Sequence, residues 1–245
     1  MPADAARLKK IRAAALLLSL LSLLVVVVSA YLRLDGAGLG CTDWPACYGR
    51  LLGSEPQPPA FGIARLLHRL VATCALLLAG FLIWQCRRPF PIQPTARYAT
   101  MLLVLMLLLS ALGIWSADQR IALVGFLNIV GGFGLVTLSW RVVLATGPAL
   151  SRAVAQGVLL RFGLAALSVT VLLGAWIGAS YAAVSCASLP NCAGLWWPSV
   201  DGWAAFNPLL RLTGAALPGD AGGAALNLLH RYGAVVTLLL LGAAG

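Results

Sequence analysis

The sequence contains two histidines, His68 and His230, and each follows two leucines and precedes an arginine. Both lie in long apolar stretches, where an ionisable side chain is costly, so both are candidate functional residues. A neutral imidazole can ligate haem iron, and helix bundles build such sites from inward-facing side chains. The alternative is that each imidazole lies at the outer membrane interface and bonds to a backbone carbonyl.

The arginines that follow the histidines, Arg69 and Arg231, would lie about 100° further around each helix. From there a guanidinium could reach a haem propionate, although an arginine that anchors the helix at the interface explains each one equally well. Glycines such as Gly131 and Gly174 in other apolar stretches could leave room for a flat macrocycle. Close helix packing is the simpler explanation of these glycines.

Four cysteines form two pairs with the same spacing, Cys41 with Cys47 and Cys186 with Cys192. An exoplasmic compartment permits disulfides, and five intervening residues can bring the two alpha carbons within bonding reach. We predict that each pair is a disulfide or a redox-active dithiol, with free thiols as the alternative. Zinc is less favoured because no histidine lies near either pair to complete a site.

The cysteine pairs also reveal an internal repeat. After each pair comes a stretch rich in Pro, Gly and Trp, and then the phrase Leu-Leu-His-Arg. This recurring order indicates duplication of a helical unit. We therefore predict a first four-helix transmembrane half with an outer Cys-x5-Cys cap over 1–146, and an incomplete second half of two spans with a similar cap over 147–245.

Composition determines which elements position these residues. Of 245 residues, 61% are hydrophobic and 10% are charged, which excludes a soluble globular protein. A helix needs about 20 apolar residues to cross a bilayer. We predict an all-α, polytopic transmembrane bundle of six spans, the first being a retained anchor rather than a cleaved signal. The spans are 13–32, 62–85, 98–117, 121–140, 159–182 and 223–244.

Charge predicts the orientation of these spans. The N-terminus and the loops after the second and fourth spans carry ten bases and one acid, whereas the other side carries seven bases and six acids. Basic residues are retained in the cytoplasm, so the N-terminus is predicted to be cytoplasmic and the cysteine-bearing caps periplasmic. The net charge of +10 then reflects insertion in the lipid bilayer, and a nucleic-acid partner is not expected.

The first cap resembles the signature Gly-Leu-x-Cys-x-Asp-Trp-Pro-x-Cys-x-Gly of the haem A synthase family, which also includes cytochrome oxidase assembly proteins. The second cap, from Tyr181 to Pro198, and both Leu-Leu-His-Arg phrases are similar to that family as well, so that the likeness covers most of 30–245. The residues that match the signature are Gly38-Leu39-Gly40-Cys41-Thr42-Asp43-Trp44-Pro45-Ala46-Cys47-Tyr48-Gly49.

The resemblance implies a membrane oxidoreductase of two four-helix halves that converts the C8 methyl of haem O to the formyl of haem A, with water as the oxygen source, for cytochrome c oxidase assembly. It implies a haem b cofactor in one half and haem O as the substrate of the other, in the inner membrane. It implies His68 and His230 as axial ligands. Haem O synthase and further copies of the chain are open as partners.

Three features depart from the family pattern. Arg65 stands three residues before His68, where the family has a glutamate proposed to act in catalysis, and a guanidinium cannot accept a proton. Asn128 stands where the family has the partner histidine of the first half. The last two family helices, with the fourth histidine, do not follow, so we expect a truncated record or a clipped gene product.

These departures leave three functional hypotheses. The first is haem A synthase, with the oxidative chemistry carried by the haem iron. The second is a degenerate, non-catalytic haem-binding paralogue or assembly factor, which Arg65 and Asn128 favour. The third, least favoured, is a quinone-linked thiol oxidoreductase that uses the cap cysteines, although these lack the usual Cys-x-x-Cys spacing.

Overall fold

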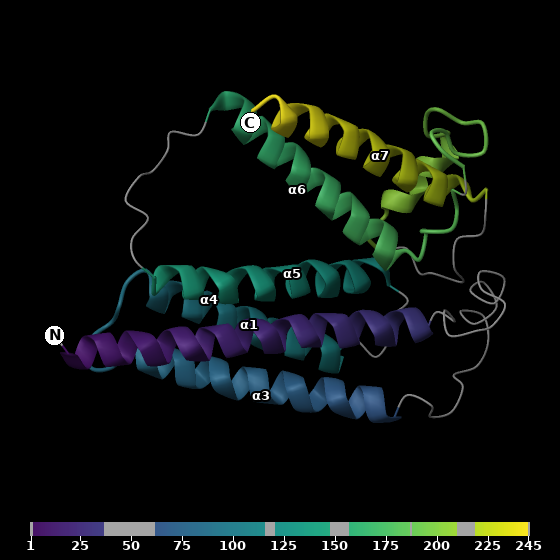
Figure 1. Ribbon diagram of the computed structural model, residues 1–245. Coiled ribbons are helices and arrows are strands. Elements are labelled where there is room, and N and C mark those ends of the chain that lie inside the picture. The colour runs from purple at the N-terminus through teal and green to yellow at the C-terminus, as the bar shows by residue number, and fades with distance from the viewer. Residues whose placement is uncertain are drawn as a thin grey trace. The chain divides into compact units, whose positions relative to one another are not determined.

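The computed structural model describes residues 2–36, 62–115, 121–147, 157–186, 188–209 and 219–244. Across these residues the secondary structure is helical, with a short 3-10 helix and no strand (Figure 1). Within the described residues, six helices are long and apolar enough to cross a membrane, which confirms the predicted six spans. The elements are α1 (Pro2–Gly36), α3 (Gly62–Arg87), α4 (Thr95–Trp115), α5 (Ala122–Ala145), α6 (Val158–Ala179), η1 (Asp201–Phe206) and α7 (Ala221–Gly242).

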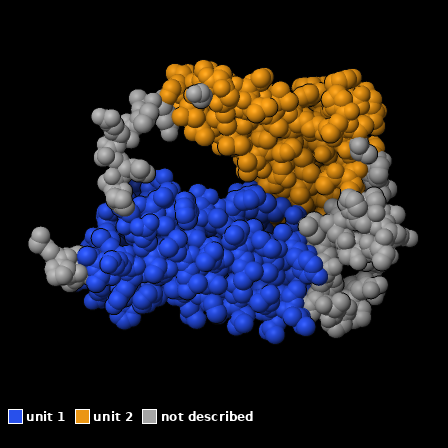
Figure 2. Space-filling model, viewed as in Figure 1, with its two compact units in different colours: residues 1–33, 57–117, 128–151 blue, residues 34–56, 118–127, 152–245 orange. Residues whose placement is uncertain are grey.

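The chain forms two compact units (Figure 2). Unit 1 comprises residues 1–33, 57–117 and 128–151 and so contains α3, α4 and most of α1 and α5. Unit 2 comprises 34–56, 118–127 and 152–245 and contains α6, η1 and α7. The first turns of α5 belong to unit 2. The division into two repeated halves, 1–146 and 147–245, stays a prediction from the sequence.

Small side chains build the core of unit 1. Ala75 and Ala79 of α3 are buried with Ala96 and Ala99 of α4, and larger side chains such as Leu18 fill the space between the helices. Small residues allow helix backbones to approach closely where lipid gives no hydrophobic driving force between helices. This packing leaves most of the remaining apolar side chains on the outside of the unit, as expected in a bilayer.

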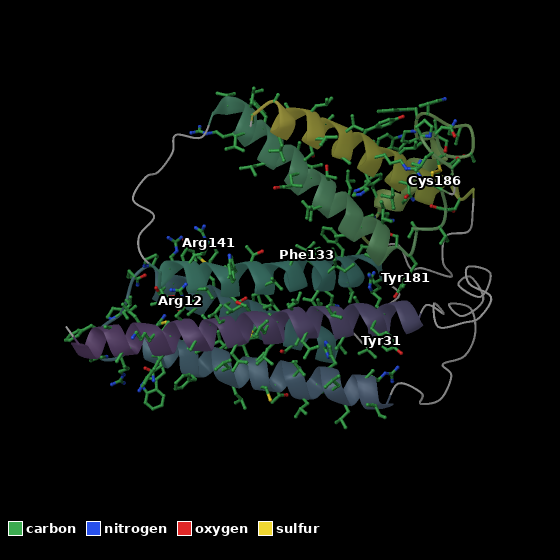
Figure 3. The ribbon with its side chains drawn as sticks, in the orientation of Figure 1. Arg12, Tyr31, Phe133, Arg141, Tyr181 and Cys186 are labelled. Carbon is green, nitrogen blue, oxygen red and sulfur yellow. A yellow bond between two sulfur atoms is a disulfide. The ribbon has the colours of Figure 1, made fainter. Side chains whose placement is uncertain are left out.

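Basic side chains gather at one end of unit 1. Figure 3 places Arg12 and Arg141 towards that end and Tyr31 towards the other. Arg141 lies over the ring of Tyr98, 5.2 Å from its centroid, and donates to its hydroxyl at 3.0 Å. Arg7 donates to the carbonyl of Gln85 at 2.8 Å and thereby joins α1 to the end of α3.

In unit 2, α6 and α7 pack side by side with opposite directions. Residue numbers rise along α6 where they fall along α7, so the two helices are antiparallel. The contacting pairs are Gly163 with Leu241, Thr170 with Thr237, and Gly174 with His230. The cap between them includes η1, whose Ala205 carbonyl accepts a 2.9 Å hydrogen bond from the Trp176 indole. The described part of this cap therefore folds back onto the helices.

The ends of α6 and α7 are fixed by the backbone and by one side chain. Tyr181 has φ 52°, and the amide of Ala182 donates to the carbonyl of Ile177 at 3.0 Å, the arrangement of a Schellman motif. The predicted span 159–182 therefore ends earlier, at Ala179. Asp220 caps α7 by accepting from the Gly223 amide at 2.6 Å.

Candidate histidine site and outer cap

His230 lies nine residues after the start of α7, which places it about 14 Å along the helix. Thr170 lies nine residues before the end of α6, and the two residues meet across the helix pair. The Nδ1 atom of His230 lies 3.0 Å from the carbonyl oxygen of Thr170. The half-buried imidazole is thus held within the apolar length of the helix pair.

This contact determines the tautomer of a neutral His230. A carbonyl oxygen can only accept a hydrogen bond, so Nδ1 must carry the proton. Nε2 then carries the lone pair, the form in which imidazole ligates metals. Metal-ligating histidines usually donate their other N–H to a carbonyl or a carboxylate, as His230 does here.

Gly174 gives the imidazole its space. A methyl group added at Gly174 would lie 3.0 Å from Cε1 of His230 and 3.5 Å from Nδ1. Any side chain at this position would therefore press on the ring that it faces. Gly174 acts here by its lack of a side chain, one turn of α6 beyond Thr170.

A pair of threonines continues this face of the helix pair. The Thr170 hydroxyl donates to the Ala166 carbonyl at 2.9 Å, so in the 3.2 Å contact between the two hydroxyls Thr237 is the donor. Both threonines are buried. Gly233 makes room for them, since a methyl group there would lie 2.6 Å from Thr170 Oγ1.

Arg231 turns away from this face and binds the cap. Its Nη1 atom donates to the carbonyls of Ser188 at 2.8 Å and Asn191 at 3.0 Å, and Nη2 to that of Cys186 at 3.3 Å. These carbonyls belong to the loop closed by the Cys186–Cys192 disulfide, whose alpha carbons are 5.1 Å apart. The predicted second cysteine pair is therefore confirmed as a disulfide in this structure, near the N-terminal end of α7 (Figure 3).

Comparison with known proteins identifies the family. The profile of the COX15-CtaA cytochrome oxidase assembly proteins matches residues 12–61 and 123–245. The chain belongs to this family. Heme A synthase from Shewanella oneidensis is 31% identical over 90% of this chain and 73% of its own length, and Heme A synthase from Shouchella clausii is 28% identical over 73% of this chain and 62% of its own. A third Heme A synthase, from Symbiobacterium thermophilum, is 34% identical over 51% of this chain and 39% of its own length.

The family match covers some of the predicted site residues and leaves others out. It includes Asn128, His230 and Arg231, together with both cysteine pairs, but leaves out residues 62–122, which carry Arg65, His68 and Arg69. Cys41 and Cys47 lie outside the described residues. His230 lies within the residues that match the family and makes the hydrogen bond to Thr170, whereas His68 lies outside the matched residues.

In unit 1 of this family member, His68 and Asn128 occupy equivalent places on their helices. Each lies six residues after the first residue of its helix, α3 or α5, about 9 Å along. Both side chains are half-buried. Arg65 and Arg69 are exposed on α3 and flank His68 at three residues before and one after, so two guanidinium groups accompany this imidazole.

Sequence reasoning missed Thr170 and Thr237 as members of the His230 site. A helical signal for the α7 face was nevertheless present, because His230, Gly233 and Thr237 are spaced three and four residues apart and so share one face. The partner residue Thr170 had no comparable signal. Thr170 accepts the hydrogen bond of the imidazole with its backbone carbonyl, a group that every residue type carries.

Proposed function

We propose that this chain binds haem through Nε2 of His230 and acts in haem A biosynthesis. The observation that carries the proposal is the 3.0 Å contact from Nδ1 of His230 to the Thr170 carbonyl, which leaves Nε2 as the ligand atom. Gly174 supports it by leaving the imidazole unhindered. The relatives named Heme A synthase support the choice of haem over other metal centres.

The reaction that we propose is oxidation of the C8 methyl of haem O to a formyl group. This conversion adds the oxygen of one water molecule and releases four protons and four electrons, so it needs an electron acceptor from outside the chain. Bound haem iron supplies the redox chemistry, with haem b as the resident cofactor and haem O as the substrate. The residues of the chain hold the imidazole at the Thr170 carbonyl and pack α6 against α7 beside it.

The proposed setting is the inner membrane, with the N-terminus in the cytoplasm and both cysteine-bearing caps in the periplasm. Haem O synthase is then the enzyme that supplies the substrate, and association of several copies of the chain remains open to test by mass measurement in lipid nanodiscs. A disulfide between Cys41 and Cys47 would match the one at Cys186 and Cys192.

Haem content and haem identity test the proposal. The chain is expressed with a supply of haem O, and extracted haems are separated while the spectrum of the purified pigment is recorded. We expect bound haem and the appearance of haem A. His230→Ala should lower the occupancy of the haem bound in unit 2 about tenfold or more, because an axial ligand is lost, whereas Ser168→Ala on the exposed side of α6 should leave it unchanged.

A second candidate is a haem-binding family member that does not oxidise its haem. Arg65 favours it, because an always-charged guanidinium stands on α3 where the family resemblance implies a glutamate. Bound haem O without haem A would select this candidate. A chain that binds no haem would contradict both candidates, as would a His230→Ala variant with full haem content.

A further inference from the structure

We propose that Arg231 is a positioning residue that clamps the disulfide loop to α7, and that it does not serve as a haem propionate partner. The loop runs from Cys186 to Cys192. It meets α7 at Arg231, ten residues and about 15 Å from the start of the helix. The two cysteines also pack against Ala224 and Leu228, so the loop lies along the first three turns of α7.

The guanidinium of Arg231 is occupied by the loop. Besides the carbonyls of Cys186, Ser188 and Asn191, its Nη1 atom also lies 3.3 Å from that of Pro190. The side chain is half-buried. Four carbonyl dipoles around one cation replace the water that the charge loses and satisfy the loop backbone at the same time.

Neighbouring side chains of α7 reinforce the clamp. The Tyr232 hydroxyl donates to the Trp196 carbonyl, and its ring stacks on Trp197 with centroids 6.2 Å apart. One turn earlier, Asn227 donates to the Ala182 carbonyl at 2.9 Å. Within unit 2, therefore, Asn227 and Arg231 on one face of α7 and Tyr232 on the neighbouring face all contact the cap.

A propionate would have to displace this arrangement. Arg231 could pair with a carboxylate only by releasing carbonyls of the loop, which would then need other donors at that depth of the helix. Since His230 is the adjacent residue and faces α6, the clamp also fixes the helix turn that presents the imidazole. This last consequence rests on the proposed function, whereas the clamp itself does not.

Reduction of the disulfide reports on the clamp in the haem-free chain. Dithiothreitol transfers two electrons and two protons to the Cys186–Cys192 bond, giving two thiols and the cyclic disulfide of the reagent, and a maleimide then captures the thiols. The other four cysteines, Cys41, Cys47, Cys74 and Cys86, are replaced so that only this pair is labelled. Circular dichroism and monodisperse elution confirm that each variant is folded.

Arg231→Gln and Arg231→Lys should each speed labelling about tenfold, because hydrogen bonds from a charged group are lost and a compact ammonium cannot span four carbonyls. Arg161→Gln, which removes an exposed charge at the other end of α6, is the matched control and should keep the parent rate. A parent rate in either Arg231 variant would overturn the clamp.

The haem-loaded protein separates the clamp from the propionate role. With the clamp, Arg231→Lys should retain haem and broaden its absorption bands, because the imidazole takes a wider range of orientations. Loss of haem in Arg231→Gln with full retention in Arg231→Lys, together with unchanged labelling, would instead assign Arg231 to a propionate. Failure of His230 to bind haem leaves the labelling experiment intact, so the two proposals fail independently.

Discussion

At the residue scale, the site depends on one imidazole whose tautomer is set by a backbone carbonyl. The Thr170 carbonyl accepts from Nδ1 of His230, and Gly174 leaves the ring free to adopt that orientation. The sequence was enough to select His230 as a candidate site residue within an apolar span. Its orientation could not be predicted, because it depends on a carbonyl and a missing side chain of another helix.

Gly174→Val should displace the imidazole from the Thr170 carbonyl. The added side chain begins 3.0 Å from Cε1 of His230, which is closer than an ordinary van der Waals contact, and valine has little freedom to turn away. We expect the occupancy of the haem bound in unit 2 to fall about tenfold, in the range seen when the support of a metal ligand is lost.

Gly80→Val is the control for Gly174→Val, because nothing lies within 4 Å of a methyl group at Gly80 in α3. Haem content is measured after extraction and normalised to protein. Equal haem content in Gly174→Val and the parent chain would show that the ring does not need this space.

At the element scale, the apolar runs predicted the helices, whereas local capping of the backbone decided where the helices begin and end. The predicted span 223–244 corresponds to α7 at Ala221–Gly242, which begins behind the Asp220 cap. The predicted span 159–182 extends three residues too far, because Tyr181 and Ala182 are apolar and continue the run. The left-handed backbone at Tyr181 that ends α6 leaves no trace in hydropathy.

Asp220→Ala should destabilise α7 by about 1 kcal/mol, because the Gly223 amide loses its acceptor at the start of the helix. Unfolding of the purified chain in detergent by added denaturant measures the difference. Asp201→Ala is the control. Asp201 is an exposed acid in the first turn of η1, whose N-cap makes no side-chain hydrogen bond, and its replacement should change the stability by less than about 0.5 kcal/mol.

At the scale of the whole molecule, charge supports an orientation across the membrane. The basic side chains at one end of unit 1, including Lys10, Arg12 and Arg141, are exposed, and exposed Trp84 and Trp140 lie on the same two helix ends as Arg87 and Arg141. Basic residues beside tryptophans are typical of a cytoplasmic membrane interface. We therefore propose that this end of unit 1 faces the cytoplasm.

Labelling with a membrane-impermeant maleimide tests this orientation in a chain whose native cysteines are replaced. Lys10→Cys should react in inside-out vesicles and be protected in intact spheroplasts. Val200→Cys, an exposed position in the second cap, should show the opposite pattern. The orientation is wrong if Lys10→Cys reacts in spheroplasts and Val200→Cys does not.

The sequence by itself determined the class of fold and the residues that could do chemistry. Long apolar runs suffice to predict six spans, because a helix in lipid must satisfy its own backbone. Tertiary structure alone decided what each polar side chain contacts. Two neighbours in sequence, His230 and Arg231, point to different partners, one to a carbonyl of α6 and the other to the disulfide loop, because successive residues project about 100° apart around a helix.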